Sequence, residues 1–183
     1  MAAKKKTKAH PRRKAAVKAK QRPKAKSKPK RKIVAARKSK PKTPPAGFHV
    51  VTPAFRVPGC GKAIEFMQQA FGAKVVQRYD APDGQVAHCE LRIGDSLIMC
   101  GDCEPDQVWH MSAMIYVKDC DATFQRALAA GATAKEPPAD QFYGDRNGRV
   151  LDPFGNEWVV ATHKEDVSKK EMAKRMAALM GGG

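Results

Sequence analysis

The first 45 residues of this 183-residue chain contain no aspartate, glutamate or aromatic residue, although they hold 20 lysines and arginines. The other 138 residues carry 15 basic and 18 acidic side chains, so the positive net charge of +17 belongs to the N-terminal segment. Like charges and a shortage of apolar side chains prevent a packed core, and six prolines interrupt any helix. We therefore expect residues 1–45 to form a disordered basic tail.

Long apolar runs are also missing from the chain. No run approaches the roughly 20 residues that span a bilayer, and the N-terminus has no apolar segment typical of a secretory signal. The chain has five cysteines, an odd number, and they are scattered along the sequence rather than spaced as in a disulfide framework. This pattern favours a reducing compartment. We expect a cytoplasmic protein, with association with nucleoid DNA as a further possibility. Cys100 and Cys103 form one CxxC pair without a second ligand pair, so we interpret them as small buried or rim thiols.

The basic tail predicts a polyanionic partner, and we expect nucleic acid. It has no aromatic ring to stack on bases and no folded element to enter a groove, so binding should be independent of sequence. An anionic membrane surface, a solubility tail and a transit peptide are the alternatives. The composition resembles the Lys/Ala/Pro-rich tails of linker histones and bacterial histone-like proteins. The residues expected to contact phosphates are Lys4, Lys5, Lys6, Arg12, Arg13, Lys14, Arg22, Lys30, Arg31 and Lys32.

A repeat organises residues 46–165. Alternating apolar residues predict a strand at 48–57 and three more at 74–79, 85–93 and 96–100, with a helix at 62–71 that ends at Gly72. The same order returns in a strand at 113–117, a helix at 121–130 and a strand near 134–136. Matched glycine turns, Gly94-Asp95 and Gly155-Asn156, support two tandem β-α-β-β-β modules. We place these modules at about 47–104 and 110–163.

A hairpin closes the second module. Its strands are 149–151 and 158–162, and Asp152-Pro153-Phe154-Gly155-Asn156 lies between them. Proline at the second turn position and glycine near the end are typical of a chain reversal. Alternation places Trp158 opposite Val159, so we predict that Trp158 is a core residue.

Several segments resemble the vicinal oxygen chelate superfamily, and within it the PhnB-like branch of glyoxalase/bleomycin-resistance proteins. They are AIEFMQQAFGA, DGQVAHCELRIGDSLIM, YVKDCDATFQRALAAGA, QFYGDRNGRVLDPFGNEWVVATH and KEDVSKKEM. The resemblance covers about residues 47–177 and implies an α+β fold in which two βαβββ modules form a curled mixed sheet round a cavity. It also implies a small-molecule site inside each curl and a homodimer.

Metal-dependent members of the superfamily hold a divalent ion with one side chain from the first and last strand of each module. The corresponding positions here are Thr52, Ile98, Val159 and one of Met111, Ser112 and Ala113. None is a histidine or carboxylate, and a one-residue slip would recruit only His110. We therefore expect no catalytic metal and no other cofactor.

The resemblance instead implies a largely apolar ligand cavity, which is typical of small-molecule sites. Tyr143 and Arg146 belong to its GDR stretch; Arg146 would clamp an anionic ligand, or pair with Asp145 or Asp152 to fix the hairpin. The predicted lining residues are Thr52, Ala54, Ile98, Cys100, Tyr143, Arg146, Val159 and Ala161.

Candidate catalytic residues lie on the strand 85–93. Alternation places Ala87, Cys89, Leu91 and Ile93 on one face and puts His88, Glu90 and Arg92 on the other. A carboxylate beside an imidazole can support proton transfer, whereas the alternative is a polar ladder on the sheet surface.

Residues 166–180 predict a C-terminal helix. Ser168 and Glu171 fit a capping box, and Met172, Met176 and Leu179 recur at helical spacing, as expected of a helix that docks on the domain or on a second subunit.

Three functions fit the sequence. The first is a small-molecule-binding protein tethered to nucleic acid by its tail. The second is a metal-independent enzyme that uses His88 and Glu90. The third is a chromatin-associated structural protein in which the fold is a dimerisation scaffold.

Overall fold

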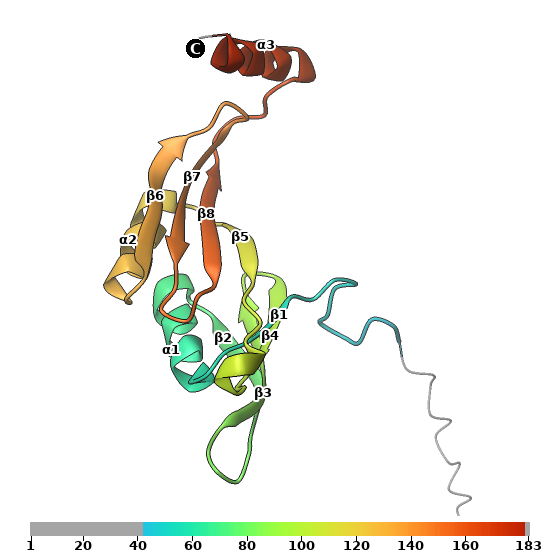
Figure 1. Ribbon diagram of the computed structural model, residues 1–183. Helices are drawn as coiled ribbons and strands as arrows, with labels where there is room; N and C mark the ends of the chain where they lie inside the picture. Colours follow the sequence, from blue (N-terminus) through green and yellow to red (C-terminus); the bar gives the residue numbers. More distant parts are fainter. Residues whose placement is uncertain (1–41, 182–183) are drawn as a thin grey trace, which may run out of the picture. The chain divides into compact units, whose positions relative to one another are not determined.

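The computed structural model describes residues 42–181 (Figure 1). The ten residues proposed to contact nucleic acid, from Lys4 to Lys32, lie outside the described residues. The first module contains β1 (Ala54–Arg56), α1 (Cys60–Phe71), β2 (Lys74–Asp80), β3 (Val86–Ile93) and β4 (Ser96–Gly101). After a short 3₁₀ helix (Pro105–Gln107), the second contains β5 (Ser112–Tyr116), α2 (Cys120–Ala129), β6 (Thr133–Asp140), β7 (Asp145–Leu151) and β8 (Glu157–His163). The α3 helix (Lys169–Met180) follows. The predicted α+β fold of two tandem βαβββ modules is confirmed.

The strands form two four-stranded mixed sheets with equivalent topology. Their orders are β1-β4-β3-β2 and β5-β8-β7-β6. In each sheet the first strand runs parallel to the last, and the other neighbours are antiparallel. One face of each sheet packs against the helix of its own module, and we call the other face the open face. No helix among residues 42–181 is long and apolar enough to cross a membrane.

The core joins the helix-covered sides of both modules. Phe55, Leu91 and Trp158 are fully buried in one cluster with the apolar side of α1. Trp158 therefore lies in the core, as predicted. The ring of Phe71, at the end of α1, lies 4.7 Å from the ring of Trp158, so the two modules share this contact.

A buried carboxylate organises the turn between β7 and β8. Asp152 accepts hydrogen bonds from the backbone N–H groups of Phe154 and Asn156 at 2.9 and 2.8 Å. It also accepts from the side-chain amide of Asn156 and from the indole N–H of Trp158, each at 3.0 Å. Because a buried carboxylate is stable only when it is well hydrogen-bonded, these contacts fix the turn.

Several predicted boundaries were wrong. Only three residues of the predicted strand 48–57 pair with β4, because the chain leaves the sheet before Ala54. The β6 strand extends from Thr133 to Asp140 through irregular pairing with β7. The α1 helix ends at the left-handed Gly72, as predicted, with φ of 68°.

The C-terminal helix begins after Ser168, whose hydroxyl accepts a hydrogen bond from the backbone N–H of Glu171 at 3.3 Å. The predicted N-terminal cap is confirmed. Arg175 anchors the helix through two hydrogen bonds to Glu165, at 2.8 and 3.0 Å. Met176 and Leu179 are 46% and 65% exposed, so residues 42–181 do not bury the apolar stripe. Docking on a second subunit stays a prediction.

The Asp152 cluster generates a prediction about stability. Replacing Asp152 with alanine should lower the free energy of unfolding by about 3 kcal/mol or more, because buried donors of Asn156 and Trp158 lose their acceptor. Urea denaturation measures this change. The control is Asp95→Ala in the equivalent turn, where the exposed carboxylate accepts from Ser96 at 2.9 Å. That variant should stay within about 0.5 kcal/mol, and equal losses in both variants would contradict the prediction.

Candidate functional site

A hollow of about 280 Å³ lies on the open face of the first sheet. Ala54, Met99 and Gly101 lie along its floor, since β1 and β4 pair Ala54 with Met99 and Arg56 with Gly101. His88 of β3 lines the hollow, and so does Trp109, whose backbone bridges to Arg56. Of the predicted site residues, Ala54, His88 and Cys100 line this hollow, and Cys100 lies between Met99 and Gly101 on β4.

His88 and Glu90 lie together on this open face. The imidazole Nε2 is 3.4 Å from Glu90 Oε1, a long contact, and the ring of His88 stacks on Tyr79 with a centroid distance of 6.4 Å. Ala87 was predicted on the opposite, apolar face, but it is exposed. The pairing of β2 with β3 shifts register between Tyr79 and Asp80, and this bulge breaks strict alternation.

Ile98 lies on the helix-covered face of β4, not at the open-face position equivalent to Val159. The turn between Ile93 and Ser96 has two residues, whereas the turn between Leu151 and Glu157 has five. The sequence prediction aligns Gly94 with Gly155, and because the turns differ in length, this alignment shifts β4 by one residue relative to β8. A one-residue shift moves every side chain to the other face of a strand. Met99, and not Ile98, is the open-face equivalent of Val159.

The same shift applies to Cys100, whose side chain lies among buried thiols. Cys89 and Cys100 are directly opposite each other on β3 and β4, and Cys60 begins α1. A hydrogen bond with Cys60, together with burial, raises the pKa of the Cys100 thiol, and burial raises the pKa of Cys89. With raised pKa values, the thiols of Cys89 and Cys100 are poor nucleophiles and act as small core residues.

Arg146 pairs with neither Asp145 nor Asp152. Its Nε and Nη2 each lie 2.7 Å from a carboxylate oxygen of Asp121, at the start of α2, and its Nη1 lies 3.2 Å from Asp140. The guanidinium lowers the pKa of Asp121. Arg146 thus ties α2 to β6 and β7 on the side away from the open face.

The open face of the second sheet carries Val159 and Ala161, which pair with Met114 and Tyr116 of β5. Tyr143 lies at the end of this face, where its hydroxyl accepts a 2.7 Å hydrogen bond from the amide of Asn147. Thr52 precedes β1 and donates to the carbonyl of His49 at 3.3 Å. The predicted residues are therefore divided between the two sheets.

Sequence reasoning missed a polar network on this second open face. The carboxylate of Asp145 is 4% exposed, accepts a hydrogen bond from the Tyr116 hydroxyl at 2.9 Å and lies 2.7 Å from His163 Nδ1. His163 Nε2 lies 3.0 Å from Asp166. These two carboxylates, Asp145 first, raise the pKa of His163. Alternation along β8, which places His163 on the face of Val159 and Ala161, was the available signal.

A metal site of the kind expected in metal-dependent relatives would use open-face residues of the first and last strands of each module. In the first sheet the paired residues at this position are Ala54 and Met99, and in the second they are Met114 and Val159. Hydrocarbon and thioether side chains do not fit the divalent ion, held by histidine and carboxylate donors, that the resemblance implies. Among residues 42–181, no three His, Cys, Asp or Glu side chains are grouped as metal ligands.

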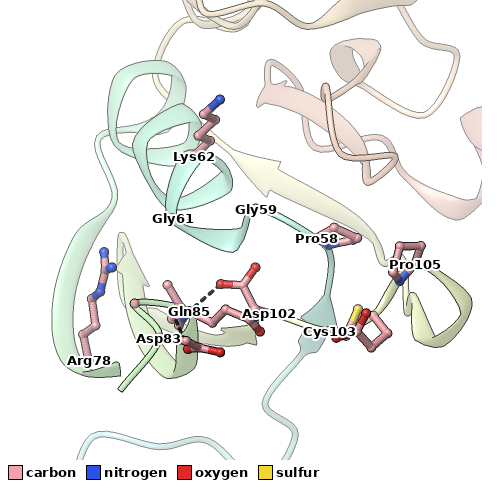
Figure 2. A pocket seen from close by; sticks show the side chains of 13 residues that line it. Pro58, Gly59, Gly61, Lys62, Arg78, Asp83, Gln85, Asp102, Cys103 and Pro105 are labelled. Atoms are coloured by element: carbon pink, nitrogen blue, oxygen red, sulfur yellow. Dashed lines mark hydrogen bonds between the residues drawn. The ribbon is translucent and has the colours of Figure 1, made fainter. Parts of the chain in front are cut away.

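Two further hollows lie elsewhere in the domain. One, of about 460 Å³, lies beside the start of α1 (Figure 2). There the Asp102 carboxylate already accepts from the N–H groups of Cys60 and Val86, at 2.8 and 2.7 Å, so it caps the helix. The other is a largely apolar cleft of about 730 Å³ between β4 and β5, lined in part by Phe71, Leu97 and Met114.

Comparison with known proteins decides the family. Residues 47–160 match the model of the Glyoxalase/Bleomycin resistance protein/Dioxygenase superfamily. The chain belongs to this superfamily. An uncharacterised protein of Mycobacterium bovis is 34% identical over 140 residues, which cover 70% of this chain and 92% of that protein. An uncharacterised Mycobacterium tuberculosis protein has the same identity, with 82% of its length covered.

Solved structures share the fold. TioX from Micromonospora is 25% identical, with a TM-score of 0.51, and the match covers 62% of this chain and 98% of TioX. An Arabidopsis thaliana gene product is 26% identical, with the same TM-score and the same coverage. A PhnB protein from Bacillus cereus is 18% identical, with a TM-score of 0.53 and coverage of 62% and 99%. At 18% identity, this last likeness shows the fold alone.

The His163 network predicts a raised titration midpoint. Because both carboxylates favour the imidazolium, NMR titration of the His163 ring should give a midpoint above the ordinary value of about 6.5. The stabilisation from these contacts should be complete below that value and should be lost as the pH rises through the folded-state pKa.

Asp145→Asn should lower the midpoint more than Asp166→Asn, because the Asp145 contact is the stronger cause. A midpoint at or below the ordinary value in the unmodified chain would contradict the network.

Proposed function

We propose that this superfamily member binds a small organic molecule in the open-face hollow of its first sheet and is tethered to nucleic acid by its basic tail. The observation that carries the first part is the convergence of His88, Met99 and Trp109 on one hollow. Apolar walls with a few polar groups are the usual composition of a small-molecule site. Chemistry through a metal is not part of the proposal, because the open-face residues do not fit one.

A homodimer is part of the same proposal. The open faces and their edges expose large apolar side chains, with Trp109 and Tyr116 each 63% exposed and Tyr79 57% exposed. Such surface on a soluble domain commonly marks an interface. A second copy over these faces would enclose the ligand, and would also present two tails to one polyanion. Sedimentation equilibrium should give twice the chain mass of 20.0 kDa, and the mass of a single chain would remove the dimer from the proposal.

Ligand binding is tested by a thermal-shift screen of small organic molecules, together with native mass spectrometry for a copurified compound. A compound present at about 100 times its Kd adds about 2.7 kcal/mol of stability and raises Tm by several degrees. Met99→Arg should abolish this shift, because the longer side chain fills the open-face hollow.

Met114→Arg is the matched control, since it places the same charge on the open face of the second sheet, opposite Val159, and in the larger cleft. A shift lost in Met114→Arg and kept in Met99→Arg would move the site to that cleft.

The tail is tested by DNA retention. Deleting residues 1–45 should abolish retention at low salt, because the remaining residues carry a net charge of −3. If 6–10 of the 20 tail charges contact phosphates, affinity of the full chain should fall by about 10³–10⁵ between 50 and 200 mM salt. A shuffled tail of the same composition is the control and should bind equally. Retention that survives the deletion would remove the tether.

A metal-independent enzyme is the second candidate, favoured by the contact between His88 and the half-buried Glu90. Glu90 is positioned to orient the imidazole for proton transfer. Turnover of a substrate found by screening should fall about 10²-fold or more in His88→Ala, whereas Tm should be unchanged. Equal turnover in both proteins would exclude His88 from catalysis.

A further inference from the structure

We propose that the hollow on the open face of the first sheet selects a planar aromatic carboxylate, which rests on the proposed small-molecule function and specifies its ligand class. Three independent features of the hollow support this class. They are its aromatic walls, its low floor, and a guanidinium that no carboxylate neutralises.

The walls are rings at the two sides of the hollow. Trp109 lies beyond the β1 edge, held by backbone hydrogen bonds with Arg56 at 2.9 and 3.0 Å, yet its side chain is 63% exposed. On the opposite side, His88 of β3 stacks on Tyr79 with the two rings 29° from parallel. The exposed indole and the imidazole both line the hollow, and each provides a stacking surface for a flat ring.

The floor between these walls is built from short side chains. Ala54 and Gly101 present little or no side chain, and Met99 is a flexible thioether that adapts to a ligand. A Cβ at Gly101 would lie 3.0 Å from the carbonyl oxygen of Ala87, so a larger residue does not fit there without movement. With a volume of about 280 Å³, the hollow has room for one ring or two fused rings rather than a large ligand.

Arg56 supplies the charge. Its Nη2 donates to the backbone carbonyl of Asp102 at 2.7 Å, which positions the guanidinium without neutralising it. Within residues 42–181 no ion pair is present to Arg56, Arg92 or Arg126, and of these three only Arg56 lines the hollow. The carboxylate-paired arginines are Arg78, Arg146, Arg149 and Arg175. A positioned guanidinium with unused N–H donors binds carboxylates in a directional, often bidentate way. An anion attached to a flat ring therefore fits the hollow, and a cation does not.

The experiment is isothermal titration calorimetry of the full chain with three probes that share one ring system. The probes are 1-naphthoate, 1-naphthylmethanol and 1-naphthylmethylamine, all in 0.3 M NaCl to weaken binding of the anion to the tail. Naphthoate should bind tightest and the amine weakest. Arg56→Gln should weaken naphthoate at least about tenfold and leave the alcohol nearly unchanged. Trp109→Leu should weaken naphthoate and the alcohol together.

Arg92→Gln is the matched control. It removes the same charge from β3, where the Arg92 guanidinium donates to the carbonyl of Asp95 at 3.2 Å, outside the hollow. It should leave naphthoate binding unchanged, and Arg56→Lys should restore only part of the affinity, because an ammonium lacks the planar fork.

Three results would overturn the ligand class. In the first, the alcohol binds as tightly as naphthoate, and Trp109→Leu abolishes the binding of both probes. The hollow would then bind aromatic rings without preferring a carboxylate. In the second, naphthoate affinity is the same in Arg56→Gln and falls steeply with salt, which assigns the anion to the tail. In the third, no probe binds although a compound from the thermal-shift screen still depends on Met99, so the proposed function survives and the aromatic carboxylate does not.

Discussion

The carboxylate of Asp152 is the contact on which the geometry of the second module depends. Buried away from water, it is held by four hydrogen bonds from Phe154, Asn156 and Trp158. Those bonds fix a five-residue turn and orient the indole of Trp158, which packs against Phe71 of the first module. Because a buried carboxylate without partners is strongly unfavourable, the turn has one stable geometry. The register of β7 and β8, and the contact between the modules, both follow from it.

Register then separates two kinds of side chain in each sheet. The helix-covered faces hold the buried thiols in the first module and Trp158 in the second, and Arg146 ties α2 to the sheet on that side. The open faces hold the groups that are able to meet a ligand, His88 and Met99 in one sheet and Val159 and His163 in the other. Two modules with the same topology thus have different chemistry, since the first open face has an unpaired guanidinium and the second a buried carboxylate shared by Tyr116 and His163.

Much of the candidate site follows from alternation along single strands. Alternation places His88 with Glu90, and Val159 with Ala161, on the open faces, and Trp158 in the core. Strand pairing places the side chains of Ile98 and Cys100 on the helix-covered face, which the sequence did not show because the shared glycine-containing turns hide a difference in length, two residues against five. Cys100 still lines the open-face hollow, and Ile98 lines the larger cleft. Ala87 was misplaced by a bulge in the pairing of β2 with β3. Neither error shows in the local pattern of a strand, because turn length and bulges act on all residues that follow them.

The two βαβββ modules, the end of α1 at Gly72 and the cap of α3 at Ser168 could all be predicted from sequence alone. Each of these depends on residues that are close in the chain, such as a glycine at positive φ or a hydroxyl three residues from a free N–H. Three features needed the folded structure: the backbone bridge between Trp109 and Arg56, the equivalence of Met99 with Val159, and the network of Tyr116, Asp145 and His163. Those arrangements bring together residues that are far apart in sequence, and they are set by strand register and by the packing of α1 and α2 against the sheets.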